Sequence, residues 1–176
     1  SIGYAKNVGK GNALKTGFKE ALKQGFEYAI TIDSDGQHYA DDIPKFVLAL
    51  QKNPGALFMG SRNIEHDGMP QKNSFANKFS NFWVKLQTGN DLPDTQTGFR
   101  LYPLKAVEKL CLFTSKFEFE VEIQVKLAWQ NIKVISVPIK VKYDPNERVT
   151  HFRPLQDFTR ISFLNTYLTI LTFLWY

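Results

Sequence analysis

Short apolar segments alternate with segments of helical periodicity in the first third of the sequence, and this alternation constrains the fold most strongly. Residues 14–22 carry apolar side chains at helical spacing, and the continuously apolar run 28–32 is typical of a buried strand. A second helical pattern over residues 42–52 precedes a second apolar run at residues 56–59. Helix, strand, helix and strand in this order predict an α/β fold, with a mostly parallel central sheet and helices on both faces.

The rest of the sequence is less regular. Apolar residues between Phe75 and Leu86 predict a third helix, and Pro103 favours the start of a short fourth one. Residues 117–127 alternate between apolar and polar side chains, so their periodicity predicts a strand. Residues 132–143 also alternate and contain more β-branched side chains, which makes them the better strand prediction.

Composition sets the limits for the kind of protein. At 176 residues with 43% hydrophobic residues, the chain is long enough for one domain with a core of its own. Cys111 is the single cysteine, so no internal disulfide can form and a reducing compartment is expected. The net charge of +5 favours an anionic partner, such as a phosphorylated substrate, an acidic lipid surface or a nucleic acid.

Both ends of the sequence are informative. The chain starts at Ser1 without a signal-peptide pattern, and we expect it to be a piece of a longer protein. Residues 161–176 carry no charge and are shorter than the roughly 20 residues that cross a bilayer. Their polar residues recur at helical spacing, so the helix either packs on the core or lies on, or begins to enter, a membrane. We therefore expect a core domain at 1–154 and an apolar amphipathic helix at 155–176.

An acidic motif follows the first predicted strand. Asp33 and Asp35 stand one residue apart, followed by Gly36 and Gln37, and Gly36 favours a tight exposed turn. Mg²⁺ is held by one or two carboxylates, water molecules and substrate phosphate oxygens. Ligands of open α/β sheets bind beyond the carboxyl ends of the strands, where this motif lies. The motif indicates a Mg²⁺ or Mn²⁺ site, although such spacing also arises by chance.

Several basic residues lie in segments that resemble loops or turns. Arginine grips phosphate oxygens with two parallel hydrogen bonds, although an exposed arginine is more often simply solvated. Lys10 stands between two glycines just before the first helix, which resembles a turn that approaches a phosphate. It lacks the spacing of a P-loop. The arginines in question are Arg62, Arg100, Arg148 and Arg153.

Other titratable residues give weaker indications. A general base could come from any of four carboxylates, although exposed charges on a strand face would form the same pattern. The three histidines show no zinc-ligand spacing, and each is expected to be structural or solvent-facing. The carboxylates are Asp94, Glu118, Glu120 and Glu122, and the histidines are His38, His66 and His151.

Eight motifs occur in an order that resembles family 2 glycosyltransferases, specifically the branch of dolichyl- and polyprenyl-phosphate sugar synthases. The resemblance extends from about residue 7 to residue 153. Its motifs are Asn7–Gly11, Thr31–His38, Asp41–Pro44, Gly60–Arg62, Asp94–Tyr102, Phe119–Ile123, Val137–Ile139 and the pair Tyr143 and Arg148.

The resemblance implies a nucleotide-diphospho-sugar transferase fold (GT-A-like) and sugar transfer with inversion at the anomeric carbon. It also implies that Glu120 opens a helix, against the alternation noted above. The resemblance implies that Asp33, Asp35 and Gln37 bind the metal ion. It implies that Arg148, Lys10 and Asp33 bind the donor diphosphate. Arg62 and Arg100 would contact the acceptor phosphate and the reacting centre. Asp94 is the implied base if the acceptor is a hydroxyl.

The implied partners are a nucleotide-diphosphate sugar and a polyprenyl phosphate or another lipid-linked or envelope glycan acceptor, at the cytoplasmic face of a membrane. The sequence departs from the family where no nucleotide-base-binding strand precedes Lys6, and where Val149–Arg153 follows Arg148. A sugar nucleotidyltransferase and a basic membrane- or nucleic-acid-binding module are the alternatives. Nucleic acid is not an expected partner, because most aromatic residues fall on apolar helix faces that pack into a core.

Overall fold

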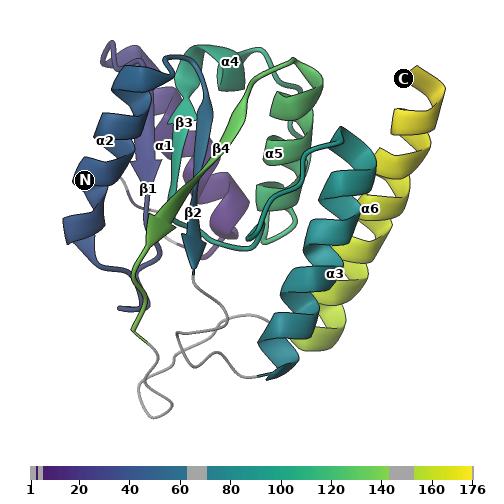
Figure 1. Cartoon of the computed structure of the whole chain (residues 1–176). Helices are drawn as coiled ribbons and strands as arrows, with labels where there is room; N and C mark the ends of the chain where they lie inside the picture. Colours follow the sequence, from purple (N-terminus) through teal and green to yellow (C-terminus); the bar gives the residue numbers. More distant parts are fainter. Residues whose placement is uncertain (1–2, 4–5, 63–70, 143–152, 176) are drawn as a thin grey trace.

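The computed structural model describes residues 3, 6–62, 71–142 and 153–175, and Figure 1 shows their arrangement. The elements, in chain order, are α1 (Lys10–Lys23), β1 (Tyr28–Thr31), the short 3₁₀ helix η1 (Ala40–Asp42), α2 (Ile43–Lys52), β2 (Leu57–Arg62), α3 (Gln71–Thr88), β3 (Arg100–Pro103), α4 (Leu104–Glu108), α5 (Phe119–Trp129), β4 (Val134–Ile139) and α6 (Pro154–Trp175). The helices and strands predicted before residue 62 are confirmed.

The four described strands form one mixed sheet in the order β1-β3-β2-β4. β2 and β4 are parallel, but β3 is antiparallel to both β1 and β2. The prediction of a mostly parallel sheet was therefore wrong. β1, β2 and β4 do share one direction, and β3 is inserted between two of them. A short apolar run is compatible with either strand direction, so the sequence pattern could not reveal this reversal.

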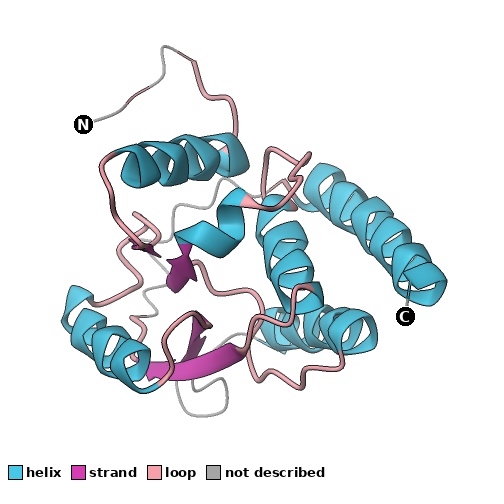
Figure 2. Ribbon diagram, turned by 90° about the horizontal axis from the view of Figure 1, so that it is seen from above, coloured by secondary structure: helices cyan, strands magenta, loops and turns pink. Residues whose placement is uncertain are grey.

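Helices cover both faces of the sheet, as predicted (Figure 2). On one face, Phe46 of α2 packs with Phe58 of β2 and Phe99. On the other face, α1, α4 and α5 cover Leu57 and Met59 of β2. The two faces of β2 are thus both apolar, which explains its continuous apolar run.

α3 and α6 lie side by side at one end of the molecule (Figure 1). Phe79 of α3 stacks on Phe158 of α6, and Gln87, further along α3, contacts Asn165, further along α6. These two contacts show that the helices run in the same direction. Gln87 Nε2 donates to the backbone oxygen of Asn165 at 3.1 Å and to Thr169 Oγ1 at 3.1 Å. Part of the polar stripe of α6 therefore faces α3 rather than solvent.

Residues 119–129 form helix α5, as the family resemblance implied, so the strand predicted from alternation alone was wrong. The apolar residues of this helix as far as Leu127 are buried, and Glu120, Glu122 and Gln124 between them are buried as well. A helix surrounded by protein on all sides needs no polar face, so helical periodicity is absent from its sequence.

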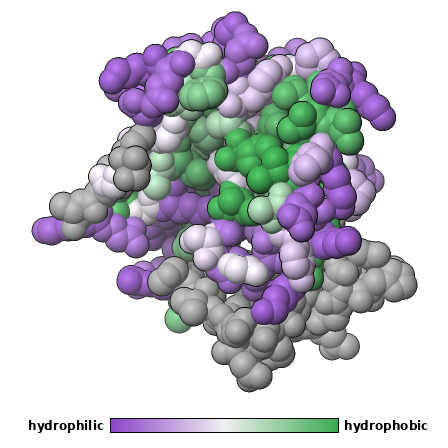
Figure 3. Space-filling model, turned by 90° about the vertical axis from the view of Figure 1, so that its left-hand side faces the viewer, coloured by the Kyte–Doolittle hydropathy of each residue, from purple (hydrophilic) through white to green (hydrophobic). Residues whose placement is uncertain are grey.

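The side of the molecule that carries α2 and the free edge of β1 is shown in Figure 3. A hydrophobic area occupies the middle of this side, and hydrophilic residues surround much of it. Segments around β1 and α2 contain the exposed apolar residues Phe26, Ile32, Val47 and Leu48. Apolar surface is therefore exposed on this side as well as on α6.

Candidate functional site

The candidate site lies beyond the ends of the strands, along the edge of the sheet where β1, β2 and β4 end and β3 begins. Thr31 at the end of β1 and Met59 in β2 both pair with Arg100, the first residue of β3. Arg62, the last residue of β2, pairs with Ile139 at the end of β4. The segments beyond these strand ends therefore meet at one edge, the position at which open α/β sheets bind ligands.

Asp33 follows β1 at this edge, with a side chain that is 30% exposed. The Thr31 hydroxyl donates to the backbone oxygen of Gly98 at 2.8 Å and so holds the end of β1 against the segment before β3. A Cβ atom at position 98 would overlap the Asp33 carboxylate. The carboxylate thus occupies space that only a glycine leaves open.

Asp35, Gly36 and Gln37 form the exposed turn that the sequence predicted. Asp35 is exposed, and its Oδ1 accepts a hydrogen bond from the backbone N–H of Gln37 at 3.0 Å. Gly36 has a φ of 74°, a left-handed conformation that favours glycine. The Gln37 carbonyl accepts the backbone N–H of Lys142 at 2.9 Å, so the turn is attached to the segment after β4.

His38 follows this turn, and its side chain is buried, as a structural histidine would be, and not solvent-facing. Its side chain is 5% exposed, and its Nε2 is 4.0 Å from Asp33 Oδ2. Burial lowers the pKa of His38 by more than the nearby carboxylates of Asp33 and Asp35 raise it, so the ring is neutral at neutral pH. Nδ1 is buried and has no hydrogen-bond partner within the described chain, and the ring lies edge-on to Phe99.

The acidic turn has the chemistry for a divalent cation. Within the described ranges, no three His, Cys, Asp or Glu side chains are grouped to hold a metal ion. Mg²⁺ and related cations nevertheless need only one or two protein carboxylates, since water and ligand phosphates supply the remaining oxygens. Asp33 is partly exposed and Asp35 is exposed, so both carboxylates are accessible for such a cation.

Lys10 reaches the same place from the first turn of α1. Its ammonium lies 2.6 Å from Asp33 Oδ1 and 2.9 Å from Glu120 Oε2. Burial lowers the pKa of Lys10, but the two carboxylates raise it further, so the net shift is upward and the ammonium stays charged. Gly9, the N-cap of α1, has a φ of 98° and approaches the backbone oxygen of Ser115, which places the start of the helix against the segment before α5.

Arg62 and Asp94 form a bidentate ion pair at the end of β2. Arg62 Nε lies 2.5 Å from Asp94 Oδ2, and the terminal nitrogen lies 2.8 Å from Oδ1. Asn77 Nδ2 and the backbone N–H of Gln96 donate to the same carboxylate at 2.7 and 3.1 Å. Asp94 has no exposed surface, whereas the Arg62 side chain keeps 14% of its own.

Arg100 is 1% exposed and is surrounded by backbone carbonyls. Its guanidinium donates to the carbonyl oxygens of Thr97 at 2.6 Å, Thr95 at 3.0 Å and Glu120 at 2.8 Å. The resemblance implied that Arg100 contacts the acceptor phosphate. In this arrangement its guanidinium does not face solvent, from which an acceptor would approach. Its contacts instead attach the segment before β3 to the first turn of α5.

The three candidate glutamates of α5 lie inside the protein and not on an exposed strand face. Glu122 accepts hydrogen bonds from Thr114 and from the backbone N–H of Phe113, and it pairs with Lys126 at 2.6 Å. Burial raises the pKa of Glu122, but these partners lower it further, and the net shift is downward. Glu122 therefore serves the fold, whereas Glu120 is the one of the three that contacts Lys10 at the site.

Three expected site or histidine positions, Arg148, His66 and His151, lie outside the described residues. Arg153 is described and exposed, at the start of α6. Reasoning from the sequence missed the pairing of Lys10 with Glu120, since more than a hundred positions separate them. No local pattern could have revealed a contact at that separation.

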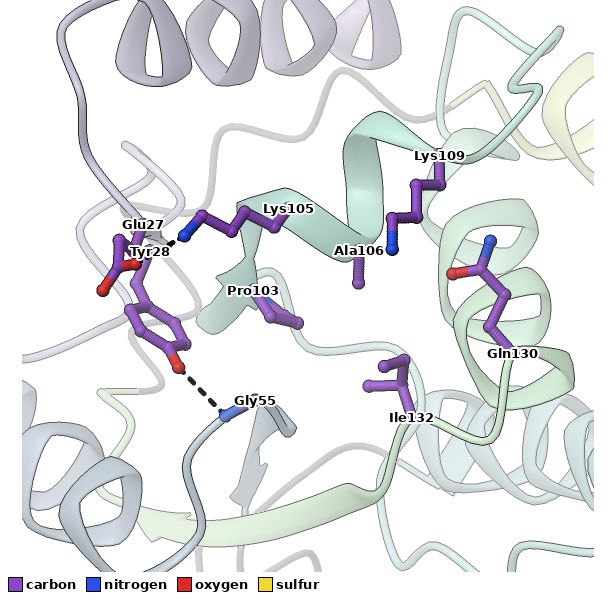
Figure 4. A pocket seen from close by; sticks show the side chains of 9 residues that line it. All are labelled: Glu27, Tyr28, Gly55, Pro103, Lys105, Ala106, Lys109, Gln130 and Ile132. Carbon is purple, nitrogen blue, oxygen red and sulfur yellow. Dashed lines mark hydrogen bonds and ion pairs between the residues drawn. The ribbon is translucent and has the colours of Figure 1, made fainter.

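The hollow drawn in Figure 4 lies at the opposite edge of the sheet, because Tyr28 and Pro103, which line it, pair at the other end of β1 and β3. It has a volume of about 520 Å³. Lys105 pairs there with Glu27, and the backbone N–H of Gly55 donates to the Tyr28 hydroxyl. A second hollow, of about 670 Å³, adjoins the acidic turn and is lined by Tyr39, Asp41, Asp42, Lys45, Lys140 and Val141.

Comparison with protein families gives one match for this chain. The profile of glycosyl transferase family 2 matches residues 4–111, which include the acidic turn, Lys10, Arg62, Asp94 and Arg100. The matched region therefore covers most of the described residues at this site, whereas Glu120 and the end of β4 lie beyond it.

Two curated relatives share this similarity. The chain is 30% identical over 148 residues to a UDP-N-acetylglucosamine–dolichyl-phosphate N-acetylglucosaminyltransferase of Methanococcus voltae, covering 81% of this chain and 59% of that protein. It is 24% identical over 137 residues to an undecaprenyl-phosphate mannosyltransferase of Micrococcus luteus, covering 74% of this chain and 56% of that protein. The chain thus spans less than two thirds of the length of these relatives.

Among solved structures, the fold resembles glucosyl-3-phosphoglycerate synthase from Mycobacterium tuberculosis in complex with Mn²⁺, UDP-glucose and glycerol 3-phosphate. The TM-score is 0.53 at 15% sequence identity, and the match covers 93% of this chain and 55% of that one. This similarity establishes the fold as an α/β fold of the GT-A type.

Proposed function

Because the chain belongs to glycosyl transferase family 2, we propose that the protein transfers a sugar from a nucleotide-diphosphate sugar, with inversion at the anomeric carbon, at the sheet edge built by Asp33, Asp35 and Lys10. The observation that carries this proposal is the ion pair of Lys10 with the accessible carboxylate of Asp33 beyond the end of β1, with a second accessible carboxylate, Asp35, two residues further along the same turn. A structural relative binds Mn²⁺ and UDP-glucose, which supports a donor of this class.

Asp33 and Asp35 are the residues that would hold Mg²⁺ or Mn²⁺, with the Gln37 side chain as an additional ligand. The metal would supply positive charge to the diphosphate of the donor, where negative charge develops as the nucleotide departs. Hydrogen bonds from Gln37 and Lys142 fix the backbone of this turn, and the space left by Gly98 accommodates the Asp33 carboxylate. These contacts preorganise the carboxylates, so that little rearrangement is needed on binding.

Lys10 provides a second positive charge for the donor diphosphate. Its ammonium lies against Asp33, and its side chain is 25% exposed. The ammonium can therefore contact a phosphate placed beside the acidic turn. We include Arg148 in the same role on the basis of the family resemblance. Two cationic side chains and a metal stabilise a departing diphosphate more strongly than its uncleaved form.

The hydrogen bonds of Asp94 favour a phosphate as the acceptor. Both oxygens of Asp94 are engaged by Arg62, Asn77 and Gln96, so neither is free to accept a proton from a hydroxyl acceptor. A polyprenyl phosphate is already anionic and needs no base, and the names of two relatives specify lipid-phosphate acceptors. Arg62, held by Asp94 but not fully buried, would contact the acceptor phosphate.

Arg100 would act as a positioning residue, and not through contact with the acceptor. Its three hydrogen bonds to backbone carbonyls hold the segment that contains Gly98 against α5. Because Gly98 lies against the Asp33 carboxylate, the hydrogen bonds of Arg100 also help to fix the position of that carboxylate.

The exposed face of α6 would bring this site to a membrane surface. No helix in the described part of the chain is long and apolar enough to cross a bilayer. α6 nevertheless exposes apolar residues along its whole length, while Leu164 and Leu168 pack in the core. The exposed apolar residues of α6 are Leu155, Phe158, Phe163, Tyr167, Ile170, Phe173 and Leu174.

The membrane proposal is tested by sedimentation of the complete protein with vesicles that contain anionic lipid. Phe163→Asp should reduce the bound fraction, since a charge on an apolar face opposes insertion at the interface. Gln51→Asp is the control, because Gln51 is an exposed polar residue of α2, a different helix. Equal binding by both variants and the wild type would show that α6 does not contact the membrane.

The donor proposal is tested by calorimetry of the complete protein with UDP-, GDP- and dTDP-sugars in the presence of Mn²⁺. We expect one of these nucleotides to bind, and Asp35→Asn to abolish the metal-dependent part of the affinity while the fold is retained. Asp41→Asn, a change at an exposed aspartate of the following 3₁₀ helix, is the control. Unchanged metal-dependent affinity in Asp35→Asn would refute the proposed site.

A further inference from the structure

The ammonium of Lys10 forms an ion pair with the carboxylate of Asp33, which is a metal ligand in the proposed function. The distance from Lys10 Nζ to Asp33 Oδ1 is 2.6 Å, and that to Glu120 Oε2 is 2.9 Å. The three side chains are 25%, 30% and 11% exposed, respectively, so Lys10 and Asp33 are open to solvent and Glu120 is the most buried member of the cluster. A cation of the protein therefore lies against the oxygen that a divalent cation would approach.

Glu120 is fixed more firmly than the other two members of this cluster. It lies in the first turn of α5, and its backbone carbonyl accepts a hydrogen bond from the buried Arg100 at 2.8 Å. Gly11, the neighbour of Lys10, packs so closely on Phe119, the neighbour of Glu120, that a Cβ at position 11 would lie 2.6 Å from that side chain. The backbones that carry Lys10 and Glu120 are thus held together, whereas Asp33 comes from a separate loop.

The Glu120 carboxylate pairs with Lys10 through Oε2, and the buried Arg100 guanidinium adds a second positive charge nearby. Oε1 is buried and has no hydrogen-bond partner among the described residues. A buried carboxylate is stable only when a positive charge compensates for lost hydration. Glu120 is therefore stabilised by its ion pair with Lys10, and this pair would hold Lys10 near Glu120 when Lys10 loses Asp33.

We infer that Glu120 is a positioning residue that retains Lys10 at the site while a divalent cation displaces it from Asp33, so that Lys10 then turns to the donor diphosphate. This inference rests on the proposed donor site. A divalent cation at Asp33 Oδ1 and the Lys10 ammonium would repel each other and compete for one oxygen. Metal binding alone leaves Lys10 with a single carboxylate, whereas the donor diphosphate supplies Lys10 with a new anionic partner.

Metal and donor binding are consequently coupled through Lys10. The donor stabilises the position of Lys10 in which Asp33 is free for the metal, so each ligand raises the affinity of the other. Glu120 limits how far Lys10 can move, and thereby keeps the ammonium within reach of the phosphates. Without Glu120, Lys10 would pair with Asp33 alone and compete more strongly with the metal.

The test is the binding of Mn²⁺ alone, followed in the complete protein by the electron paramagnetic resonance signal of free Mn²⁺. Lys10→Met should raise the affinity for Mn²⁺ up to about fivefold in the absence of donor, which is the change expected for removal of a competing, partly exposed ion pair worth at most about 1 kcal/mol. Glu120→Gln should lower it about threefold by strengthening the competition from Lys10.

A double substitution separates positioning from a simple effect of charge. In the Lys10→Met background, Glu120→Gln should change Mn²⁺ affinity by less than about twofold, because the residue through which Glu120 acts is absent. Glu118→Gln is the matched control, since Glu118 is a buried carboxylate at the N-cap of the same helix that accepts a hydrogen bond from the backbone of Lys116. It should leave Mn²⁺ affinity unchanged.

Two results would overturn the inference and leave the proposed function standing. One is a normal affinity for Mn²⁺ in Lys10→Met, and the other is an equal loss on Glu120→Gln with and without Lys10. Absence of Mn²⁺ binding by the wild type, with and without nucleotide sugars, would instead overturn the proposed function together with this inference.

Discussion

Gly98 is the residue whose substitution most directly tests how the fold shapes the acidic turn. All three carboxyl atoms of Asp33 lie within 2.5 Å of the position that a Cβ at residue 98 would take. The backbone of Gly98 does not adopt a left-handed conformation, so alanine is acceptable there except for this overlap. Gly98→Ala therefore perturbs the Asp33 side chain specifically.

The size of the effect follows from how Asp33 can respond. Non-bonded heavy atoms pack best at separations near 3.5 Å, so the carboxylate must move by about 1 Å. Asp33 is partly exposed and can swing towards solvent, at the cost of about 1 kcal/mol for an unfavourable rotamer. Its pairing with Lys10 is weakened as well, and a partly exposed pair of this kind contributes less than about 1 kcal/mol. We expect the free energy of unfolding to fall by only about 1–2 kcal/mol.

Metal binding should be weakened as well, because a displaced carboxylate no longer meets Asp35 at one cation. We expect Gly98→Ala to weaken Mn²⁺ binding by at least about tenfold, a change of about 1.4 kcal/mol. Urea denaturation gives the stability and calorimetry with Mn²⁺ gives the affinity. Gly17→Ala is the matched control, since no atom lies within 4 Å of its Cβ position in α1, and alanine should stabilise that helix by up to about 1 kcal/mol.

Mn²⁺ affinity equal to that of the wild type in Gly98→Ala would refute this reasoning. It would show that Asp33 does not need the position it holds against Gly98 in order to bind a metal. A loss of stability well above 3 kcal/mol would refute it differently, by showing that the substitution disturbs the backbone and not the side chain of Asp33 alone.

Two further predictions concern the fold. Glu122→Gln should lower the free energy of unfolding by about 3 kcal/mol at pH 7, because it leaves Lys126 and Thr114 without their charged partner. The folded-state pKa of Glu122 is lowered, so its contribution to stability is present above the unfolded pKa and is lost as the pH falls through the folded pKa. When urea denaturation is measured between pH 7 and pH 3, the free energy of unfolding should therefore change less with pH in the variant than in the wild type. Leu168→Ala, at a fully buried position between α6 and the core, should cost about 2–5 kcal/mol in the same assay, and a cost below 1 kcal/mol would show that α6 does not pack as described.

The sequence determined the order of the elements around the site. The apolar runs that form β1 and β2 are short and continuous because both faces of each strand are covered, and the helical patterns before them are long enough to be unambiguous. The acidic turn after β1 was also readable, since Gly36 and the abrupt end of the apolar run are local signals. The order of the motifs indicated the family that the profile match establishes.

Tertiary structure alone decided the direction of β3 and the partners of the site residues. β3 lies reversed between β1 and β2, and an apolar run carries no information about strand direction. Lys10 meets Glu120, and Arg62 meets Asp94, across separations at which only the packing of whole elements sets a distance. Local patterns record propensity and burial, whereas the pairing of distant charges depends on how helices and strands are arranged in space, and a single sequence does not encode that in any local signal.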